Sequence, residues 1–321
     1  MQSRLKTAIE KNKVYESVMD AVGNTPIVAL SRLYSDHLDV EVLAKLEFMN
    51  PSGSIKDRMV RYMLRYAESK QKLKNQRIVE NSSGNTGAAL AMASAVLQLD
   101  CEIFVPDTTS SEKINRIQAY GADVQSCRSD VSEDNLESYY SLARTRAEES
   151  NAFHLDQYCS ELNREAHYMD TAPELWEQTA GKIDYFICGI GSGGTISGIG
   201  RFLKERNPNI QIIGVEPSGS IYKSVVDQSV AIDTFSTNIE GLGKKKPAES
   251  FDSTFVDDVI QVPDNKSLEF CHRLAREEGI LAGGSSGSIA AGIDLLLPKI
   301  KRGRVATLFP DSGVFYLSKY F

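Results

Sequence analysis

The sequence predicts an α/β fold of two domains, each a mainly parallel twisted sheet covered by helices. The first observation is length, because 321 residues exceed what a single hydrophobic core usually serves. The second is that short apolar, β-branched runs alternate with helical patterns, as in parallel sheets covered by helices. The third is that several of these runs are almost continuously apolar, as expected of strands buried on both faces.

The predicted elements follow one another regularly along the chain. Strands are predicted at Val40–Leu46, Arg77–Glu80, Cys101–Val105, Tyr185–Cys188, Gln211–Val215 and Arg304–Phe309. Helices are predicted at Asp57–Lys70, Asn85–Leu97, Ser110–Tyr120, Ile196–Arg206 and Asn265–Glu278. An acidic, polar helical region lies around Ser129–Ser160, and we expect the chain to cross between the domains near it. Ligands of open α/β sheets gather at the carboxyl ends of strands, so we expect the functional loops there.

The composition argues against several classes of protein. A net charge of −7 argues against nucleic acid as the partner. No apolar run is long enough to span a bilayer, and Met1–Lys13 lacks the apolar core of a secretory signal. The five cysteines are scattered and odd in number, which suits reduced thiols in the cytoplasm. The four histidines share no ligand spacing, so no metal site is expected.

A lysine in an unusual context follows the first predicted strand. Lys56 comes after Pro51, Ser52, Gly53 and Ser54, which suit a tight turn, and it opens a predicted helix. The positive end of the helix dipole disfavours an ammonium group there and lowers the pKa of the amine. A deprotonated amine is what Schiff-base formation requires. A lone lysine is more often a solvated charge, so this interpretation depends on the loops that follow.

A polar loop joins the strand Arg77–Glu80 to an alanine-rich helix. Over residues 81–87 it reads Asn-Ser-Ser-Gly-Asn-Thr-Gly. Backbone N–H groups at the start of a helix, together with hydroxyl groups, bind anions. Ser83 alone could cap the helix, but a cap does not need a whole run of polar residues and glycines. We therefore interpret residues 81–87 as a carboxylate-binding loop.

A glycine-rich loop follows the strand Tyr185–Cys188 and precedes another helix. Over residues 189–195 it reads Gly-Ile-Gly-Ser-Gly-Gly-Thr, and its amides and hydroxyls can close on a phosphate. It also matches the G-x-G-x-x-G pattern, with Glu216 at the end of the next strand, where dinucleotide folds place a ribose-binding acid. An NAD-dependent dehydrogenase using residues 189–194 is therefore an alternative. It leaves Lys56 and the 81–87 loop unexplained, and no second half-site is recognisable.

A serine-rich loop, Ala282–Ser288, opens a helix near the C-terminus, and it could be only a helix cap. Beside a pyridine ring, however, a serine does not keep the ring nitrogen protonated as a carboxylate would. Such a site favours β-elimination and β-replacement over transamination. An amine for an aldehyde, a loop for a carboxylate and a loop for a phosphate together describe a site for pyridoxal phosphate.

On these motifs, the chain resembles the fold-type II pyridoxal phosphate enzymes of the cysteine synthase and cystathionine β-synthase family, with the fold of the tryptophan synthase β subunit. The resemblance runs from Val-Gly-Asn-Thr-Pro at residues 22–26 to Pro-Asp-Ser-Gly at residues 310–313. It implies a smaller, mobile N-terminal domain of residues 48–158. It also implies a larger cofactor-binding domain formed by residues 1–47 with 159–321, and a homodimer.

The resemblance assigns a role to each loop. It implies that Lys56 is the catalytic residue and forms the Schiff base with the cofactor. Asn85 is expected to bind the 3′ oxygen of the cofactor and Ser285 its pyridine nitrogen. The phosphate is expected at Gly191, Ser192, Gly193, Gly194 and Thr195. The amino-acid substrate is expected at Ser82, Ser83, Asn85, Thr86 and Gln157, and at Gly241 in a loop of residues 240–243 that lines the mouth of the site.

The implied reaction is β-replacement on O-acetylserine, O-phosphoserine or serine, with sulfide or another nucleophile, as in cysteine synthase. Lys56 would move the α-proton. Motifs shared with other branches leave three alternatives open: a cystathionine β-synthase-like reaction, condensation of O-phosphoserine with glutamate as in siderophore pathways, and cysteine breakdown that releases hydrogen sulfide. After Gly313 the family usually carries Glu-Arg, whereas this chain has Val314 and Phe315, so the polar contacts of that position are in doubt.

Three consecutive lysines, Lys244–Lys246, follow the loop at the mouth of the site. Such a run is more often a solvated charged surface. The alternative is that one of the three attracts an acidic nucleophile or leaving group.

Overall fold

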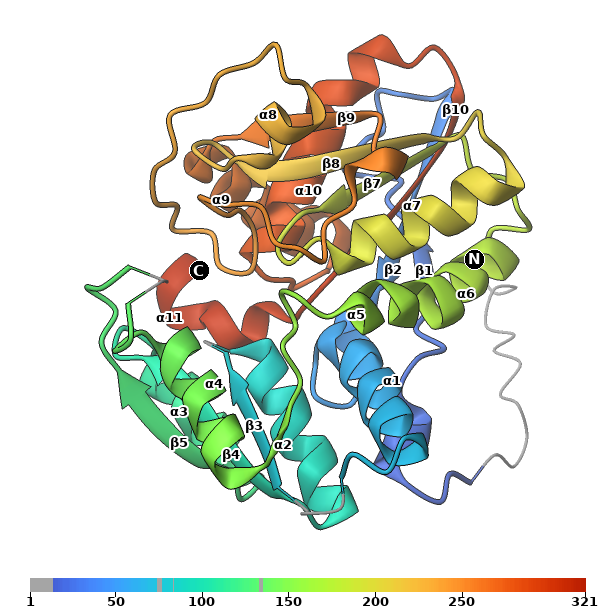
Figure 1. The fold of residues 1–321 in the computed structure, drawn as a ribbon. Helices are drawn as coiled ribbons and strands as arrows, with labels where there is room; N and C mark the ends of the chain where they lie inside the picture. The colour runs from blue at the N-terminus through green and yellow to red at the C-terminus, as the bar shows by residue number, and fades with distance from the viewer. Residues whose placement is uncertain (1–13, 74–76, 83, 133–134) are drawn as a thin grey trace.

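A computed structural model describes residues 14–73, 77–82, 84–132 and 135–321. The expectations for Met1–Lys13 and for Ser83 therefore lie outside the described residues. The chain forms two lobes, one above the other in Figure 1, and each lobe is built on its own sheet. Within the described ranges, no helix is both long and apolar enough to cross a membrane.

The larger sheet has six strands: β1 (Ile27–Ala29), β2 (Val40–Leu46), β7 (Tyr185–Gly189), β8 (Gln211–Pro217), β9 (Asp258–Val262) and β10 (Gly303–Phe309). Their order across the sheet is β1-β2-β10-β7-β8-β9. β1 runs antiparallel to β2, and the other pairings are parallel. Phe186 and Ile187 on β7 belong to the apolar clusters on opposite faces of this sheet, as the two-residue period of a strand requires.

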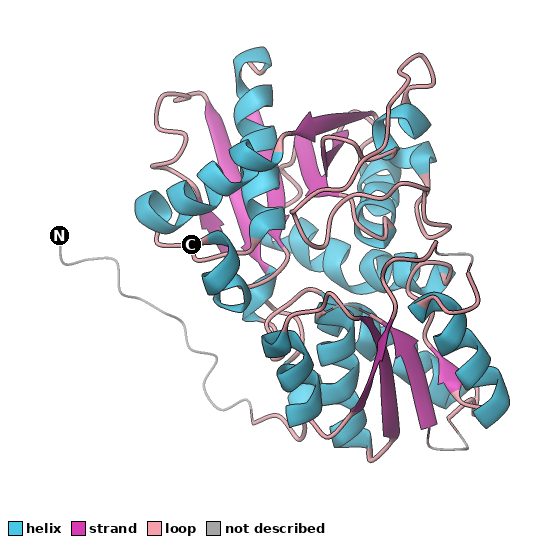
Figure 2. Cartoon of the chain, turned by 90° about the vertical axis from the view of Figure 1, so that its left-hand side faces the viewer, coloured by secondary structure: helices cyan, strands magenta, loops and turns pink. Residues whose placement is uncertain are grey.

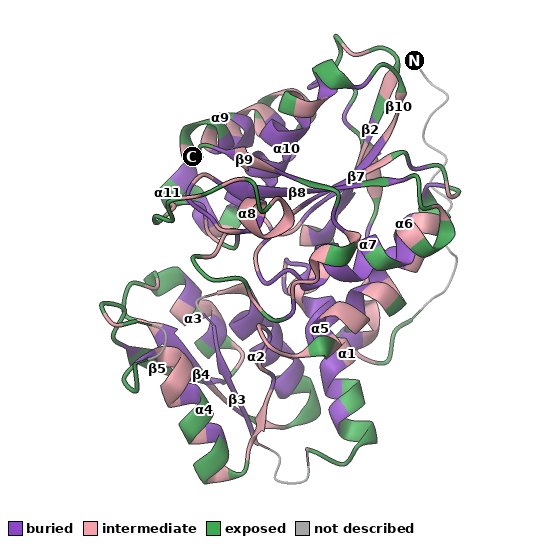
Figure 3. Cartoon of the chain, turned by 45° about the horizontal axis from the view of Figure 1, so that its top comes forward, coloured by how far each residue is buried: buried purple, intermediate pink, exposed green. Residues whose placement is uncertain are grey.

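The smaller sheet has four strands: β3 (Arg77–Asn81), β4 (Asp100–Pro106), β5 (Asp123–Cys127) and β6 (Phe153–His154). Their order is β5-β4-β3-β6, and every pairing is parallel. The buried side chains of Met59, Met63, Ile78 and Ile103 belong to the core on one face of this sheet. Strands of both sheets are largely buried in Figure 3.

Helices flank both sheets, as Figure 2 shows. The α-helices are α1 (Lys56–Ser69), α2 (Asn85–Leu97), α3 (Ser111–Ala119), α4 (Tyr139–Ser150), α5 (Glu161–Ala166), α6 (Ala172–Gln178), α7 (Gly194–Arg206), α8 (Tyr222–Val226), α9 (Asp264–Arg273), α10 (Gly284–Leu296) and α11 (Leu317–Tyr320). Short 3₁₀ or π turns are η1 (Val18–Ala21), η2 (Glu47–Met49), η3 (His167–Thr171), η4 (Ser253–Phe255), η5 (Leu274–Glu278), η6 (Leu297–Lys299) and η7 (Gly313–Tyr316).

The predicted fold class is confirmed, and all six predicted strands are present. The four strands that were not predicted, β1, β5, β6 and β9, are the edge strands of the two sheets. An edge strand needs less burial than a central one, so its sequence lacks the continuous apolar run that identifies central strands. The predicted helix Asn265–Glu278 is divided, because α9 ends at Arg273 and continues as the π turn η5.

The two sheets come from different parts of the chain. β3 to β6 fall within residues 48–158, and the strands of the larger sheet fall outside that range. The domain boundaries at 48 and 158, and the mobility of the smaller domain, stay predictions.

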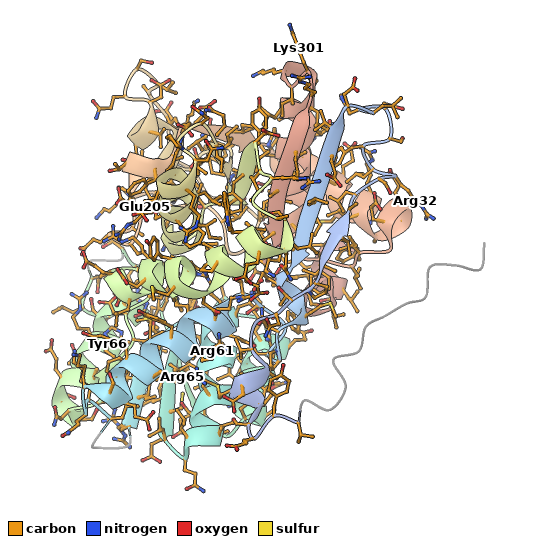
Figure 4. All side chains as sticks on the ribbon, turned by 90° about the vertical axis from the view of Figure 1, so that its right-hand side faces the viewer. Arg32, Arg61, Arg65, Tyr66, Glu205 and Lys301 are labelled. Atoms are coloured by element: carbon orange, nitrogen blue, oxygen red, sulfur yellow. The ribbon has the colours of Figure 1, made fainter. Side chains whose placement is uncertain are left out.

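Helix α1 is tied to the segments around it by ion pairs. Arg61 contacts Asp170 at 2.6 Å, and Arg65 contacts Asp20 at 2.9 Å. Figure 4 labels both arginines on the side of α1 that it shows. These contacts hold the helix that begins with Lys56.

Candidate active site

The carboxyl ends of both sheets face a common cleft. The loops after β3, β7 and β10 contribute to two adjoining hollows of about 230 and 50 Å³. Both hollows are lined by Lys56, Asn85, Gly191, Ser192, Gly241 and Leu242. A larger hollow of about 820 Å³ includes Val40 and Gly303, which begin β2 and β10, so it lies at the opposite, amino ends of these strands.

Lys56 is the first residue of α1 and is half-buried at the junction of the two hollows. Burial lowers the pKa of its amine, and the nearby Asp311 and Cys188 partly oppose this shift. The structure thus supports the expectation that this lysine is poised toward its neutral, nucleophilic form.

The turn before Lys56 is fixed by hydrogen bonds. The backbone N–H of Ile55 donates to the carbonyl of Pro310 at 2.8 Å. The carboxylate of Asp57 accepts from the N–H of Ser52 at 2.7 Å. Gly53 has a φ of +83°, which favours glycine. These contacts give the lysine one position relative to the end of β10.

The loop after β3 places its side chains at the start of α2. The hydroxyl oxygen of Ser82 accepts from the N–H groups of Gly84 at 3.3 Å and Gly87 at 3.0 Å. Ser82 therefore accepts from two backbone N–H groups at the start of α2. Thr86 donates to the side chain of Gln157 at 2.7 Å, and both line the larger of the two hollows. The structure brings Ser82, Thr86 and Gln157 together beside Lys56, and their role in carboxylate binding stays a prediction.

The glycine loop requires its glycines. A Cβ on Gly191 would lie 2.2 Å from the carbonyl oxygen of Gly241, and a Cβ on Gly194 would lie 2.2 Å from Oδ1 of Asn163. Gly193 has a φ of +87°. This loop, at the start of α7, lines the smaller hollow with Gly191, Ser192, Gly193 and Thr195, and its role in phosphate binding stays a prediction.

Two buried side chains that the sequence did not single out hold this loop. The amide of Asn163 donates to Oγ of Ser192 at 3.0 Å and to the carbonyl of Gln157 at 2.8 Å. It thereby links the glycine loop to the segment that carries Gln157. His167 contacts Oγ1 of Thr195 at 3.1 Å, and burial lowers its pKa well below the usual value, so the imidazole is neutral.

Asp311 is the buried acid of the site, and the sequence did not identify it as functional. Its Oδ2 accepts from Nδ2 of Asn85 at 2.6 Å and from the hydroxyl of Tyr316 at 2.6 Å. Its Oδ1 is buried and has no hydrogen-bond partner among the described residues. Ser285 lines the same hollow as Asp311. The position of Asp311 directly after a central strand was the available signal.

The place where family members carry Glu-Arg is occupied differently here. The Phe315 ring lies against Gly53 and carries the guanidinium of Arg116 at 3.7 Å from its centroid. Arg116, on α3, also donates to Oδ1 of Asn85 at 3.3 Å and to the carbonyl of Ser52. A positive charge therefore reaches this position from the other lobe.

Charged side chains also meet across the mouth of the cleft. Lys113 on α3 forms an ion pair with Glu240, whose other carboxylate oxygen accepts from Lys319 at 2.9 Å. Lys113 also lies 5.2 Å from the centroid of the Tyr316 ring. The loop of residues 240–243 thus contacts both lobes.

The acid required by the dehydrogenase alternative is engaged elsewhere. Glu216 is fully buried, and its carboxylate accepts from the N–H groups of Tyr222 at 2.8 Å and Lys223 at 2.9 Å. It caps the start of α8 and does not present a free carboxylate to a ribose.

The residues present fit pyridoxal phosphate. Gly191 and Gly193, the half-buried Lys56 and Asp311, whose Oδ1 has no hydrogen-bond partner among the described residues, all line one hollow. Lys56 would hold the aldehyde, the loop of residues 191–195 the phosphate, and Asn85 with Ser285 the ring. The smaller hollow would hold the cofactor, and the larger one is lined by Ser82, Thr86, Gln157 and Glu240.

Comparison with known proteins agrees with this geometry. Residues 18–311 match the family of pyridoxal-phosphate dependent enzymes. The chain belongs to this family. It is 39% identical over 312 residues to a cystathionine beta-synthase of Apis mellifera and 38% identical over 313 residues to one of Dictyostelium discoideum. These alignments cover 96% and 97% of this chain, which spans 62% of the length of each relative.

Solved structures place the chain on the cysteine synthase and cystathionine β-synthase side of the family. An O-ureido-L-serine synthase structure has a TM-score of 0.89 and 30% identity, covering 96% of this chain and 95% of its own. An O-acetylserine dependent cystathionine beta-synthase of Helicobacter pylori has a TM-score of 0.87 and 31% identity, covering 96% of this chain and 99% of its own. The predicted family, fold and cofactor are confirmed, and the protein is a pyridoxal phosphate-dependent enzyme of this type.

Proposed function

We propose that the protein catalyses β-replacement on a serine derivative, with O-acetylserine, O-phosphoserine or serine as the first substrate. The observation that carries the proposal is the position of Lys56, a buried amine of lowered pKa between a glycine cradle and the 81–87 loop. The similarity to an O-ureido-L-serine synthase and to an O-acetylserine dependent cystathionine beta-synthase supports a serine derivative as the first substrate.

Each part of the site has a task in this proposal. Bound pyridoxal phosphate supplies an electron sink for the pair left when the α-proton is removed. Ser82, Thr86 and Gln157 orient the substrate carboxylate beside Lys56. The Lys56 amine would take the α-proton and later return it, while the substituent on Cβ leaves with its bonding electrons and the nucleophile adds in its place. Ser285, which is buried and uncharged, avoids a carboxylate beside the ring nitrogen.

An absorbance spectrum of the purified protein with added pyridoxal phosphate is the first test, followed by product analysis with each serine derivative and a panel of nucleophiles. Lys56→Ala should abolish the absorbance band of the Schiff base between Lys56 and the cofactor. It should also reduce turnover by several orders of magnitude. Lys70→Ala, at the exposed far end of α1, is the matched control and should change neither. Normal turnover by Lys56→Ala would contradict the mechanism.

The panel also separates the remaining alternatives. Cystathionine formation is favoured by the similarity to proteins of that name. Glutamate as nucleophile and release of sulfide from cysteine are measured in the same assays. We expect a homodimer, as the resemblance implies, and a cytoplasmic location, as the scattered cysteines suggest; analytical ultracentrifugation tests the dimer.

A further inference from the structure

A further cavity, of about 540 Å³, adjoins the active site and has no task in the proposed function. Residues 131–132, 219–220, 235–237 and 243–246 line it, and we call it the side cavity. Gly243 and Lys244 also line the hollow of about 230 Å³ that contains Lys56, so the two spaces adjoin along this segment. Residues 131–132 follow β5 of the smaller sheet and residues 219–220 follow β8 of the larger one, so both lobes contribute to the side cavity.

The three consecutive lysines form part of this wall and differ in burial. Lys244 is half-buried and lines both spaces, whereas Lys245 and Lys246 are exposed and line the side cavity. A solvated run therefore describes the second and third lysines better than the first. The alternative that one of the three attracts an acidic group stays a prediction.

An aromatic ring is fixed on another wall of the side cavity. Phe235 is 57% exposed, and its backbone N–H donates to the carbonyl of Gly219 at 3.1 Å. A Cβ on Gly219 would lie 2.6 Å from the nearest atoms of the Phe235 ring, and Gly219 has a φ of +85°. Glycine at this position therefore lets the ring lie against the backbone. A single exposed aromatic side chain is common, but this one is held in place beside a cavity that adjoins the active site.

The segment that carries Phe235 is anchored to the larger lobe. The hydroxyl of Thr237 donates to Oδ1 of Asp264 at 2.6 Å and accepts from the N–H of Ile239 at 3.0 Å. Asp264 begins α9, and its other carboxylate oxygen accepts from the N–H of Asn238 at 2.7 Å. These contacts order the wall before a ligand arrives, which limits the entropic cost of binding.

The volumes indicate what the side cavity is suited to hold. The hollows of about 230 and 50 Å³ are needed for the cofactor and the first substrate, which leaves little room there beyond the attacking atom of a nucleophile. The side cavity, in contrast, has the size of a small-molecule site. We propose that it binds the carbon chain of an organic nucleophile, with the Phe235 ring as the main apolar contact. This inference rests on the proposed function and specifies its second substrate, since sulfide has no chain to place there.

An organic thiol illustrates how the two spaces are used together. Its sulfur forms a bond to Cβ of the first substrate, the group on Cβ leaves with the electrons of its Cβ–O bond, and the thiol proton passes to the solvent. The carbon chain extends from the hollow beside Lys56 into the side cavity and packs on the Phe235 ring. Each methylene group removed from water in this way strengthens binding.

Four sulfur nucleophiles that differ in chain length test the proposal in the pyridoxal phosphate-loaded enzyme. Sulfide has no chain, and methanethiol, 1-butanethiol and 2-phenylethanethiol carry progressively larger ones. In the wild-type enzyme, kcat/KM should rise by about two- to fourfold for each methylene group between methanethiol and 1-butanethiol. Phe235→Ala should lower kcat/KM for the two longer thiols by about 5- to 20-fold, mainly through KM. It should change kcat/KM for sulfide and methanethiol by less than about twofold.

A second variant keeps the proposal testable if Phe235→Ala folds poorly. Ser236→Trp introduces a bulky side chain into the lining of the side cavity and should lower kcat/KM for the two longer thiols by about tenfold or more, while sulfide reacts nearly as in the wild type. Phe235→Leu keeps an apolar side chain and should retain most of the activity with 1-butanethiol. Leu295→Ala removes another exposed apolar side chain, near the end of α10, and should change none of these constants.

The pattern across the four nucleophiles decides the outcome. A loss confined to the two longer thiols in either variant, with the Tm and the KM of the first substrate near their wild-type values, supports the side cavity as the binding site of the chain. An equal loss for all four nucleophiles, or no loss in either variant, would overturn it.

Failure of the proposed function has a different signature. If the wild-type enzyme performs no β-replacement with any of the four nucleophiles, the proposed function fails and the assignment of the side cavity fails with it. If the wild-type enzyme uses sulfide but gains nothing from a longer chain, β-replacement stands and only the assignment of the side cavity is wrong.

Discussion

The guanidinium group of Arg58 forms two parallel hydrogen bonds with the carboxylate of Glu47, from Nε to Oε2 at 2.7 Å and from Nη2 to Oε1 at 2.8 Å. Both side chains are fully buried. Arg58 lies two residues after Lys56 on α1, and Glu47 directly follows β2. Glu174 on α6 contacts the same guanidinium at 2.8 Å. The pair thus ties the start of α1, and with it Lys56, to the carboxyl end of a strand of the larger sheet.

Removing one partner of this pair should cost much of the protein's stability. Arg58→Met leaves the carboxylate of Glu47 buried without its partner and should lower the free energy of unfolding by about 3–5 kcal/mol. Arg65→Met, which removes an exposed pair on the same helix, should cost less than about 1 kcal/mol. Urea unfolding measures both. Adding Glu47→Leu to Arg58→Met should recover part of the loss, and a double variant less stable than the single one would contradict this explanation.

A second buried carboxyl should make stability depend on pH. Burial raises the pKa of Glu80 from 4.5 to about 8, and one of its oxygens accepts from the N–H of Asp156 at 2.8 Å. The folded protein therefore binds a proton that the unfolded chain releases, so stability should fall as pH rises from about 4.5 to 8. Glu80→Gln removes this penalty, so its effect on the free energy of unfolding should depend on pH. Relative to the wild type, the variant should be more stable at pH 8 than at pH 5 by on the order of 3 kcal/mol.

Thermal unfolding of Glu80→Gln across this pH range tests the sign directly. Glu149→Gln, an exposed position on α4, is the control and should not alter the pH profile. A profile for Glu80→Gln parallel to that of the wild type would show that the proton is bound elsewhere.

Arg116 should affect cofactor binding through Asn85. Its guanidinium holds Oδ1 of Asn85 while Asp311 holds Nδ2, so the amide has one orientation. Arg116→Met frees one side of that amide and should weaken the binding of pyridoxal phosphate by about 3- to 10-fold. The dissociation constant, measured by titrating the cofactor-free protein, is the readout. Asn115→Ala, at the exposed neighbouring position, should bind as the wild type does; equal affinity in Arg116→Met would remove Arg116 from the site.

Gly191→Ala tests the predicted phosphate-binding loop of residues 191–195 without adding a charge. The new methyl group would meet the carbonyl oxygen of Gly241 at 2.2 Å, so the loop at the mouth must move. Cofactor affinity should fall at least about tenfold, because the amides no longer converge on the phosphate. Gly121→Ala places its methyl group where no atom lies within 4 Å, and Gly121 lines neither hollow; its φ of +90° makes this variant less stable, but its cofactor affinity should stay unchanged. Tight cofactor binding by Gly191→Ala would show that the phosphate lies elsewhere.

The central strands and the three main loops of the site were predictable because their signals are local. A strand buried on both faces is a continuous apolar run, as Tyr185–Cys188 is, and an anion loop carries its glycines and hydroxyls within a few residues. Edge strands were not predicted. In β5, for example, four of the five residues are at least partly exposed, so the sequence lacks a continuous apolar run. For the same local reason, Lys56 could be proposed as a site residue from the turn that precedes it, together with the two loops that follow.

The sequence by itself determined the fold class, the family, and the lysine and glycine loops, since each depends on neighbouring residues in the chain. Only the tertiary structure decided which distant side chains complete the site. Asp311 accepts a hydrogen bond from Asn85, which lies 226 residues earlier in the chain. The guanidinium of Arg116 brings a positive charge next to the uncharged side chain of Phe315. The tertiary structure also separated Lys244, which lines the hollow that contains Lys56, from two exposed lysines of identical chemistry. Burial and pairing set the charge state and orientation of a side chain, and both depend on neighbours that only folding brings together.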